Sequence, residues 1–214
     1  MAINATNAAP VRELIPAGNY VARCYQMIEI GTVKENVMGE EKTLTKVRIG
    51  WELPTELKVF KEENGEHPLV ISKEFTLSMH EKSNLRAVLK SWRGRDFTEA
   101  EAKCFDITKL LGVPCMLNII HEPSKSDPSK IYQQISGITP ISKGYPMPEQ
   151  INKTFVLSYD NFDYDKFNSL PDFIKAKMQG SEEYKKLQAP HEESISTVTS
   201  DFLSEPNNID NIQF

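Results

Sequence analysis

Apolar and polar residues alternate in five stretches of this chain, which is the pattern of half-buried β-strands. The stretches are residues 19–32, 44–53, 69–79, 115–121 and 131–139. The second is the clearest, because Val47, Ile49 and Trp51 point to one side while the residues between them point to the other. The pattern therefore predicts five strands.

The first stretch alternates less regularly than the second. Its apolar residues at even positions are expected to share one face: Tyr20, Ala22, Cys24, Ile28 and Ile30. Charged and turn-forming residues separate the strands. The two separators at about 33–45 and 122–130 are predicted to be long loops.

A helical period replaces the strand period between the third and fourth strands. Four apolar residues fall on one face of a helix: Leu85, Val88, Leu89 and Trp92. Ser83 is placed to cap the start of this helix and Gly94 to end it. Thr98 and Glu101 have the spacing of a capping box, which predicts a second, short helix.

The order of elements is three strands, a helical insert and two strands. This is the order expected of a mainly β protein, a five-stranded OB-fold barrel, in which the open face binds oligonucleotides. A helical extension rich in aromatic residues follows. The predicted units are a flexible arm (1–16), the OB-fold domain (17–145), the extension, which packs on the core (146–187), and a disordered acidic tail (188–214).

The charge of the chain is distributed unevenly. The net charge of the 214 residues is −5. Residues 1–145 hold 19 basic and 18 acidic residues, a balance of +1, whereas residues 146–214 hold 6 and 12, a balance of −6. A nearly neutral domain with an acidic tail can bind a polyanion, although an acidic globule of the same net charge would repel one.

The chain lacks the marks of a membrane or secreted protein. No apolar run approaches the roughly 20 residues of a membrane span, and the first residues lack the pattern of a signal peptide. We therefore expect a cytoplasmic protein without a membrane partner. Cys24, Cys104 and Cys115 are expected to be buried free thiols, because they are odd in number and lie in apolar contexts.

No catalytic or metal-binding pattern is visible. The four histidines have no paired spacing, and neither a Walker motif nor a GxSxG motif occurs. The acidic residues at 160–165 lack the glycine and terminal glutamate of a calcium loop. We therefore expect neither an enzyme nor a metal or cofactor site.

Basic and aromatic residues supply the candidate chemistry. Cations bind phosphates, and aromatic rings stack on unpaired bases. The candidate DNA-binding residues are Arg23, Tyr25, Lys46, Arg48, Lys73, Arg86, Lys90, Arg93, Arg95, Phe97, Lys125 and Lys130. In contrast, Trp51, Phe75 and Trp92 lie on apolar stripes and are assigned to the core.

The acidic tail supplies a second candidate site. Asp210, Ile212 and Phe214 place an apolar ring near negative charge, which is a pattern that a basic-rimmed pocket on a partner protein can bind.

Several short motifs resemble those of the phage-encoded single-stranded DNA-binding proteins. They are HEKSNL at 80–85, WRGRDF at 92–97, LLGVPC at 110–115, ISGITP at 135–140 and KG at 143–144, and the similarity covers roughly 14–187. The resemblance implies an OB-fold, sequence-independent binding of single-stranded DNA in replication or recombination, and location in the host cytoplasm. It also implies a tail that recruits a polymerase, primase or helicase. This tail departs from the family pattern, since it has no run of aspartates and has Gln213 in place of a proline.

A second function remains open at this point. An OB-like adaptor between proteins, or a phage structural module that binds no nucleic acid, is compatible with the same strand pattern. Its acidic half would then be the binding surface.

Overall fold

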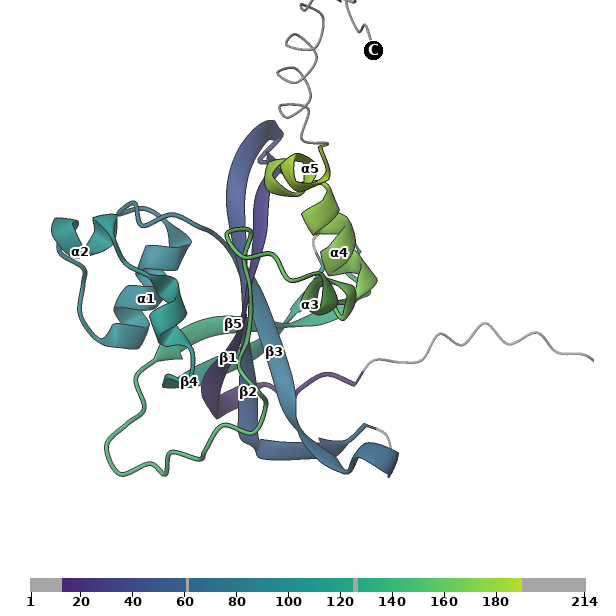
Figure 1. The fold of residues 1–214 in the computed structure, drawn as a ribbon. Helices are drawn as coiled ribbons and strands as arrows, with labels where there is room; N and C mark the ends of the chain where they lie inside the picture. The colour runs from purple at the N-terminus through teal and green to yellow at the C-terminus, as the bar shows by residue number, and fades with distance from the viewer. Residues whose placement is uncertain (1–12, 61, 125–126, 190–214) are drawn as a thin grey trace, which may run out of the picture.

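The computed structural model describes residues 13–60, 62–124 and 127–189 (Figure 1). The strands are β1 (Gly18–Val37), β2 (Glu40–Val59), β3 (Glu66–Thr76), β4 (Pro114–Pro123), β5 (Ile131–Thr139) and β6 (Phe155–Leu157). The α-helices are α1 (Asn84–Arg93), α2 (Glu99–Lys103), α3 (Tyr164–Asn168), α4 (Asp172–Gln179) and α5 (Glu182–Gln188). Two short 3₁₀ helices are η1 (Glu62–Asn64) and η2 (Ile107–Leu110). The protein is therefore mainly β, as the alternation predicts.

The six strands form one sheet in the order β3-β2-β1-β4-β5, and β6 also pairs with β1. Neighbouring strands of the main order are antiparallel, whereas β6 runs parallel to β1. Among the described residues no ladder joins β3 to β5, so the sheet is not closed. A side-chain hydrogen bond crosses between these two strands, from Lys73 Nζ to the Ile135 carbonyl oxygen at 2.7 Å.

The strand β1 serves two cores because two irregularities interrupt its pairing with β2. They lie between Cys24 and Gln26 and between Glu29 and Gly31. An extra residue in one strand turns the side chains that follow to the opposite face. Cys24 therefore lies in the principal core and Ile28 in the second core. The expectation that Ile28 and Ile30 share a face with Cys24 is wrong for this reason.

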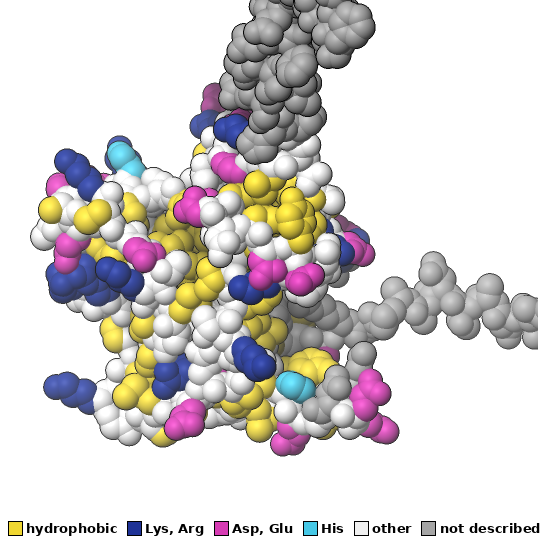
Figure 2. Space-filling model, in the orientation of Figure 1, with side chains coloured by type: hydrophobic (Ala, Val, Ile, Leu, Met, Phe, Trp, Pro, Cys, Tyr) yellow, Lys and Arg dark blue, Asp and Glu magenta, His cyan; other side chains and the backbone are white. Residues whose placement is uncertain are grey.

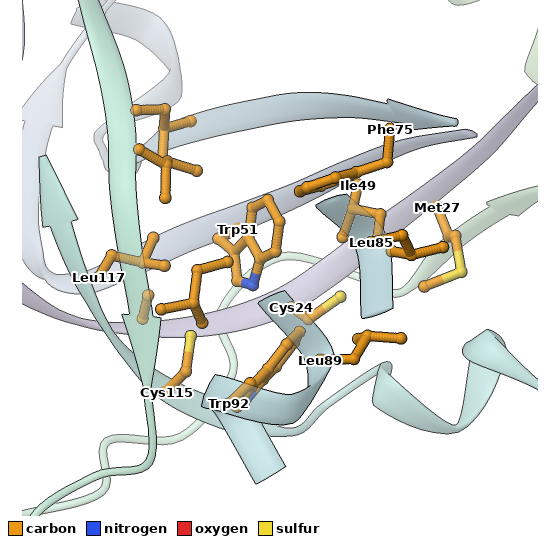
Figure 3. Packing of buried hydrophobic residues seen from close by; sticks show 14 of the residues in the cluster. Cys24, Met27, Ile49, Trp51, Phe75, Leu85, Leu89, Trp92, Cys115 and Leu117 are labelled. Atoms are coloured by element: carbon orange, nitrogen blue, oxygen red, sulfur yellow. The ribbon is translucent and has the colours of Figure 1, made fainter. Parts of the chain in front are cut away.

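The principal core lies between the sheet and α1 (Figure 3). Trp51 and Trp92 meet there with ring centroids 5.9 Å apart. Trp92 is only 5% exposed, and its Nε1 donates to the Pro114 carbonyl oxygen at 3.1 Å. The assignment of Trp51, Phe75 and Trp92 to the core is confirmed.

Two of the three cysteines belong to the same core. Cys24 and Cys115 are buried free thiols, and burial raises the pKa of Cys24 to about 12. Cys104 is exposed instead, which corrects the expectation of three buried thiols. Cys104 is the C-cap residue of the short helix α2. Because no residue of α2 is buried, this helix does not carry Cys104 into a core.

The helical signals in the insert are confirmed. The Ser83 side chain accepts from the Arg86 amide, and Gly94 ends α1 in the left-handed conformation. Thr98 and Glu101 form the expected capping box at the start of α2. These contacts satisfy amides that a helix start would otherwise leave without partners.

Residues 33–45 are not a loop. The ladder between β1 and β2 continues from Thr32↔Thr45 to Val37↔Glu40, and the hairpin turns at Met38 and Gly39. Both of these residues have positive φ, at 56° and 91°, as a tight two-residue turn requires. In the second expected loop, β4 continues to Pro123 and residues 125–126 lie outside the described residues.

The extension packs on β1 through the second core, on the side of the sheet opposite α1 and α2 (Figure 1). Polar contacts fix its end. Glu183 accepts hydrogen bonds from the Thr32 amide and hydroxyl, both at 2.6 Å. The Tyr159 hydroxyl lies 2.8 Å from the buried Ser181 hydroxyl. The predicted extension is thus part of the folded unit.

Gly31→Ala is expected to destabilise the protein by about 2–4 kcal/mol, measured by urea unfolding. Gly31 has φ +91°, and an added Cβ would lie 2.6 Å from Glu183 Oε2 and 2.8 Å from Ser181 Cβ. Gly39→Ala is the matched control, because Gly39 has the same φ and nothing lies within 4 Å. It should show only the backbone cost of about 1–2 kcal/mol. Equal costs at both positions would mean that the contact with α5 does not matter.

Candidate nucleic-acid interface

A groove of about 870 Å³ lies where the two ends of the sheet meet the extension. Its walls come from residues 70–72 of β3, residues 130–133 at the start of β5, and the segment leading into α4. The lining is Leu14, Tyr25, Gln26, Arg48, Val70, Ile71, Ser72, Lys130, Ile131, Tyr132, Gln133, Leu170, Pro171, Phe173 and Ile174. Segments far apart in the sequence thus form one concave surface.

Three aromatic side chains line this groove. Tyr132 is 50% exposed and Phe173 is 62% exposed, although rings of this size usually bury most of their surface. Tyr25 is half-buried, and burial raises the pKa of its hydroxyl. Tyr25 was expected at the site from the sequence, whereas Tyr132 and Phe173 were not.

Two cations stand beside these rings. Arg48 donates from Nη2 to the Ser72 hydroxyl at 2.6 Å, and its Nη1 lies 3.2 Å from Glu74. The same guanidinium lies 5.4 Å from the centre of the Phe173 ring. Lys130 is exposed and pairs with Asp127 at 3.1 Å. The groove therefore combines flat apolar rings with two cations, each of which also pairs with a carboxylate.

Three other predicted site residues are held in structural contacts. Arg23 donates to the carbonyl oxygens of Pro148 and Gly112, both at 2.6 Å, so it fastens two loops to β1. Lys46 pairs with Glu35 at 2.6 Å. Lys73 bridges to β5, and burial lowers its pKa. None of the three lines the groove.

The predicted insert residues form a network of ion pairs rather than a free basic surface. Figure 2 shows Lys and Arg side chains gathered over the insert, with acidic side chains among them. Lys90 pairs with Asp96 at 2.8 Å. Arg93 and Arg95 both reach Glu101, at 2.5 and 3.2 Å. Arg93 is half-buried, whereas Arg95 is exposed.

The acidic partners in this network hold their charge strongly. The hydrogen bond from Lys90 is the main cause that lowers the pKa of Asp96 to about 2. The hydrogen bond from Arg93 does the same for Glu101, whose pKa is also about 2. At neutral pH the insert cations therefore face ionised carboxylates, which leaves less charge for a phosphate.

Two of the predicted insert residues are buried. Arg86 donates to the carbonyl oxygens of Met79 and Phe97 and also contacts Asp96 and Glu99. It joins α1 to the segments before and after the helix. Phe97 is buried with its ring edge against Phe105, at a centroid distance of 4.9 Å. Both side chains therefore stabilise the insert, and neither lines the groove.

The remaining predicted site residues cannot be placed. Lys125, Asp210, Ile212 and Phe214 lie outside the described residues. Within the described part of the chain, no group of three or more His, Cys, Asp or Glu side chains could hold a metal ion. No helix in the same part is long and apolar enough to cross a membrane.

Comparisons with protein-family models, with curated proteins and with solved structures found no match to this chain. The chemistry of the groove is therefore the main ground for assigning a function.

Proposed function

We propose that this chain is an OB-fold protein that binds single-stranded DNA without sequence preference, in the groove between β3, β5 and α4. The observation that carries this is the set of Tyr25, Tyr132 and Phe173 beside Arg48 and Lys130 in one concavity. Bases of a single strand stack on such rings while cations contact the phosphates. The preference for single strands follows because duplex bases are paired and stacked, so their faces are not free to meet the rings.

The strand order supports the OB-fold part of this proposal. The OB-fold is a partly open five-stranded barrel in which strands 2 and 3 and the loop between strands 4 and 5 contribute to the binding face. Here β1 is central, β2 and β4 flank it, and β3 and β5 stand at the two ends. The bond between Lys73 and Ile135 brings these two ends together. The groove lies beside that junction.

We extend the proposal to a role in phage DNA replication or recombination without catalytic activity. The support is the resemblance of the motifs at 80–85, 92–97 and 135–140 to phage single-stranded DNA-binding proteins. Recruitment of a polymerase, primase or helicase through Asp210, Ile212 and Phe214 remains a prediction of the same resemblance.

A titration with a fluorescent oligo-dT strand tests the proposal directly. We expect tighter binding to this strand than to a duplex of equal length. Raising the salt concentration from about 50 to 200 mM should weaken binding roughly 20-fold if about three phosphates are contacted, because released counterions set the slope. Equal affinity for the duplex, or no binding at the lower salt concentration, would contradict the proposal and favour the protein adaptor.

A further inference from the structure

A second concavity lies within the helical insert and shares no residue with the groove. Its volume is about 240 Å³. The lining is Leu89, Trp92, Arg93, Phe97, Phe105, Lys109, Leu110 and Val113. Apart from the two cations, these side chains are apolar, and none is acidic. We call this concavity the insert pocket.

The two cations of the insert pocket have hydrogen-bonding capacity to spare. Lys109 is exposed, and although it interacts electrostatically with Asp106, three residues earlier, no salt bridge joins it to a residue that the structure describes. Arg93 uses Nη2 for Glu101, but its Nη1 is buried and finds no hydrogen-bond partner in the same part of the chain. A buried donor without a partner is costly, so a carboxylate at this rim would be favoured.

The apolar part of the insert pocket suits one aromatic ring. A cavity of about 150 Å³ lined by apolar side chains can hold benzene, and this pocket is larger. Phe97 and Phe105 already meet edge to face there. A further ring can join them in an edge-on or offset arrangement. The pocket therefore fits a phenylalanine that has carboxylates close to it in sequence.

The chain itself carries such a segment. Residues 190–214 contain five acidic residues and no lysine or arginine. Within them Phe202 directly follows Asp201, and Glu205 is three residues further on. Phe214 also has an acidic residue near it, Asp210, but Phe202 is the one with acidic side chains on both sides within three residues. The insert, residues 83–113, holds six basic and four acidic residues, so the charges are complementary.

We propose that residues 201–205 dock into the insert pocket of the same molecule. The Phe202 ring enters the apolar part, and the carboxylates of Asp201 and Glu205 lie toward Lys109 and Arg93. The chain between Ala189 and Phe202 can span up to about 40 Å. Tethering gives such a segment an effective concentration in the millimolar range, so a weak contact is well populated. This contact does not depend on DNA binding.

Photocrosslinking in the full chain tests the docking. Phe202 is replaced by the photoreactive analogue p-benzoylphenylalanine, and the same replacement at Phe214 is the matched control. We expect the analogue at 202 to crosslink to residues 85–113 of the same molecule, in the absence of DNA. The analogue at 214 should give a much lower yield at these residues. Mass spectrometry of the digested monomer identifies the sites.

A charge reversal at the rim sharpens the test. Lys109→Glu should lower the crosslinking yield from position 202 roughly threefold to tenfold, because attraction becomes repulsion. Lys103→Glu changes an exposed lysine of the same insert that does not line the pocket, so it should have little effect. Thermal melts show that both variants remain folded.

Three outcomes would overturn the proposal. The first is an equal yield of crosslinks to the insert from positions 202 and 214. The second is an equal effect of Lys109→Glu and Lys103→Glu on the yield from position 202. The third is crosslinks that join two chains, which would assign the insert pocket to a second copy instead of the same molecule.

Discussion

Replacing Tyr132 and Phe173 together with alanine is expected to weaken single-stranded DNA binding roughly 30-fold or more. Stacking of a base on an aromatic ring contributes about 1–3 kcal/mol, and each factor of ten corresponds to about 1.4 kcal/mol. Both rings are at least half exposed, so their removal takes little from either core. The dissociation constant from a fluorescence titration with an oligo-dT strand is the measurement.

Phe60→Ala with Tyr145→Ala is the matched control. These rings are similarly exposed but do not line the groove. The control pair should bind DNA as the parent protein does, and circular dichroism should show both pairs folded. If both pairs lose affinity equally, or if the groove pair binds normally, the groove is not the DNA site. Arg48 loses its contact with the Phe173 ring in the groove pair, but its contacts with Ser72 and Glu74 do not involve Phe173 and are expected to hold it in place.

Local patterns predicted much of the fold. The bounds of β5 agree with the predicted stretch 131–139, and α1 begins after Ser83 and ends at Gly94 as expected. Alternation and capping are properties of neighbouring residues, so a sequence reveals them without knowledge of the fold.

Features that depend on distant partners could not be predicted in this way. The irregularities in β1 appear only in its pairing with β2, and they decide which core receives Ile28. The charged residues at 33–45 resemble a loop when they are considered singly. In the hairpin they face opposite charges across the strands, as Lys34 and Glu41 do at 2.8 Å.

In the candidate site, too, local features could be predicted and features that depend on distant partners could not. The sequence identifies cations but not which of them are already paired. Arg86 lies outside the apolar stripe of its helix, yet it is buried because carbonyl oxygens of neighbouring segments accept its hydrogen bonds. In the sequence, Tyr132 had only a weak indication that it belongs to the site, because it is an aromatic residue followed by two glutamines. Phe173 had none, because only the packing of α4 decides which aromatic residues of the extension remain exposed.

Trp92→Ala is expected to destabilise the protein by about 3–5 kcal/mol, the usual cost of removing a buried aromatic side chain. Trp92 is nearly inaccessible, packs on Trp51 and donates a hydrogen bond to the Pro114 carbonyl oxygen. Removing it leaves a cavity between α1 and the sheet and takes the donor away from that carbonyl. For a chain of this size the midpoint of thermal unfolding should fall by roughly 6–20 °C.

Trp92→Phe separates the two contributions. Phenylalanine keeps most of the apolar contact with Trp51 but cannot donate to Pro114, so a smaller loss of about 1–2 kcal/mol is expected. Thermal melts and DNA titrations on the same samples distinguish a core residue from a stacking residue. A core residue changes the melting temperature and leaves the affinity of the folded protein nearly intact. If Trp92→Ala melts normally while DNA binding collapses, Trp92 stacks on a base and its assignment to the core is wrong.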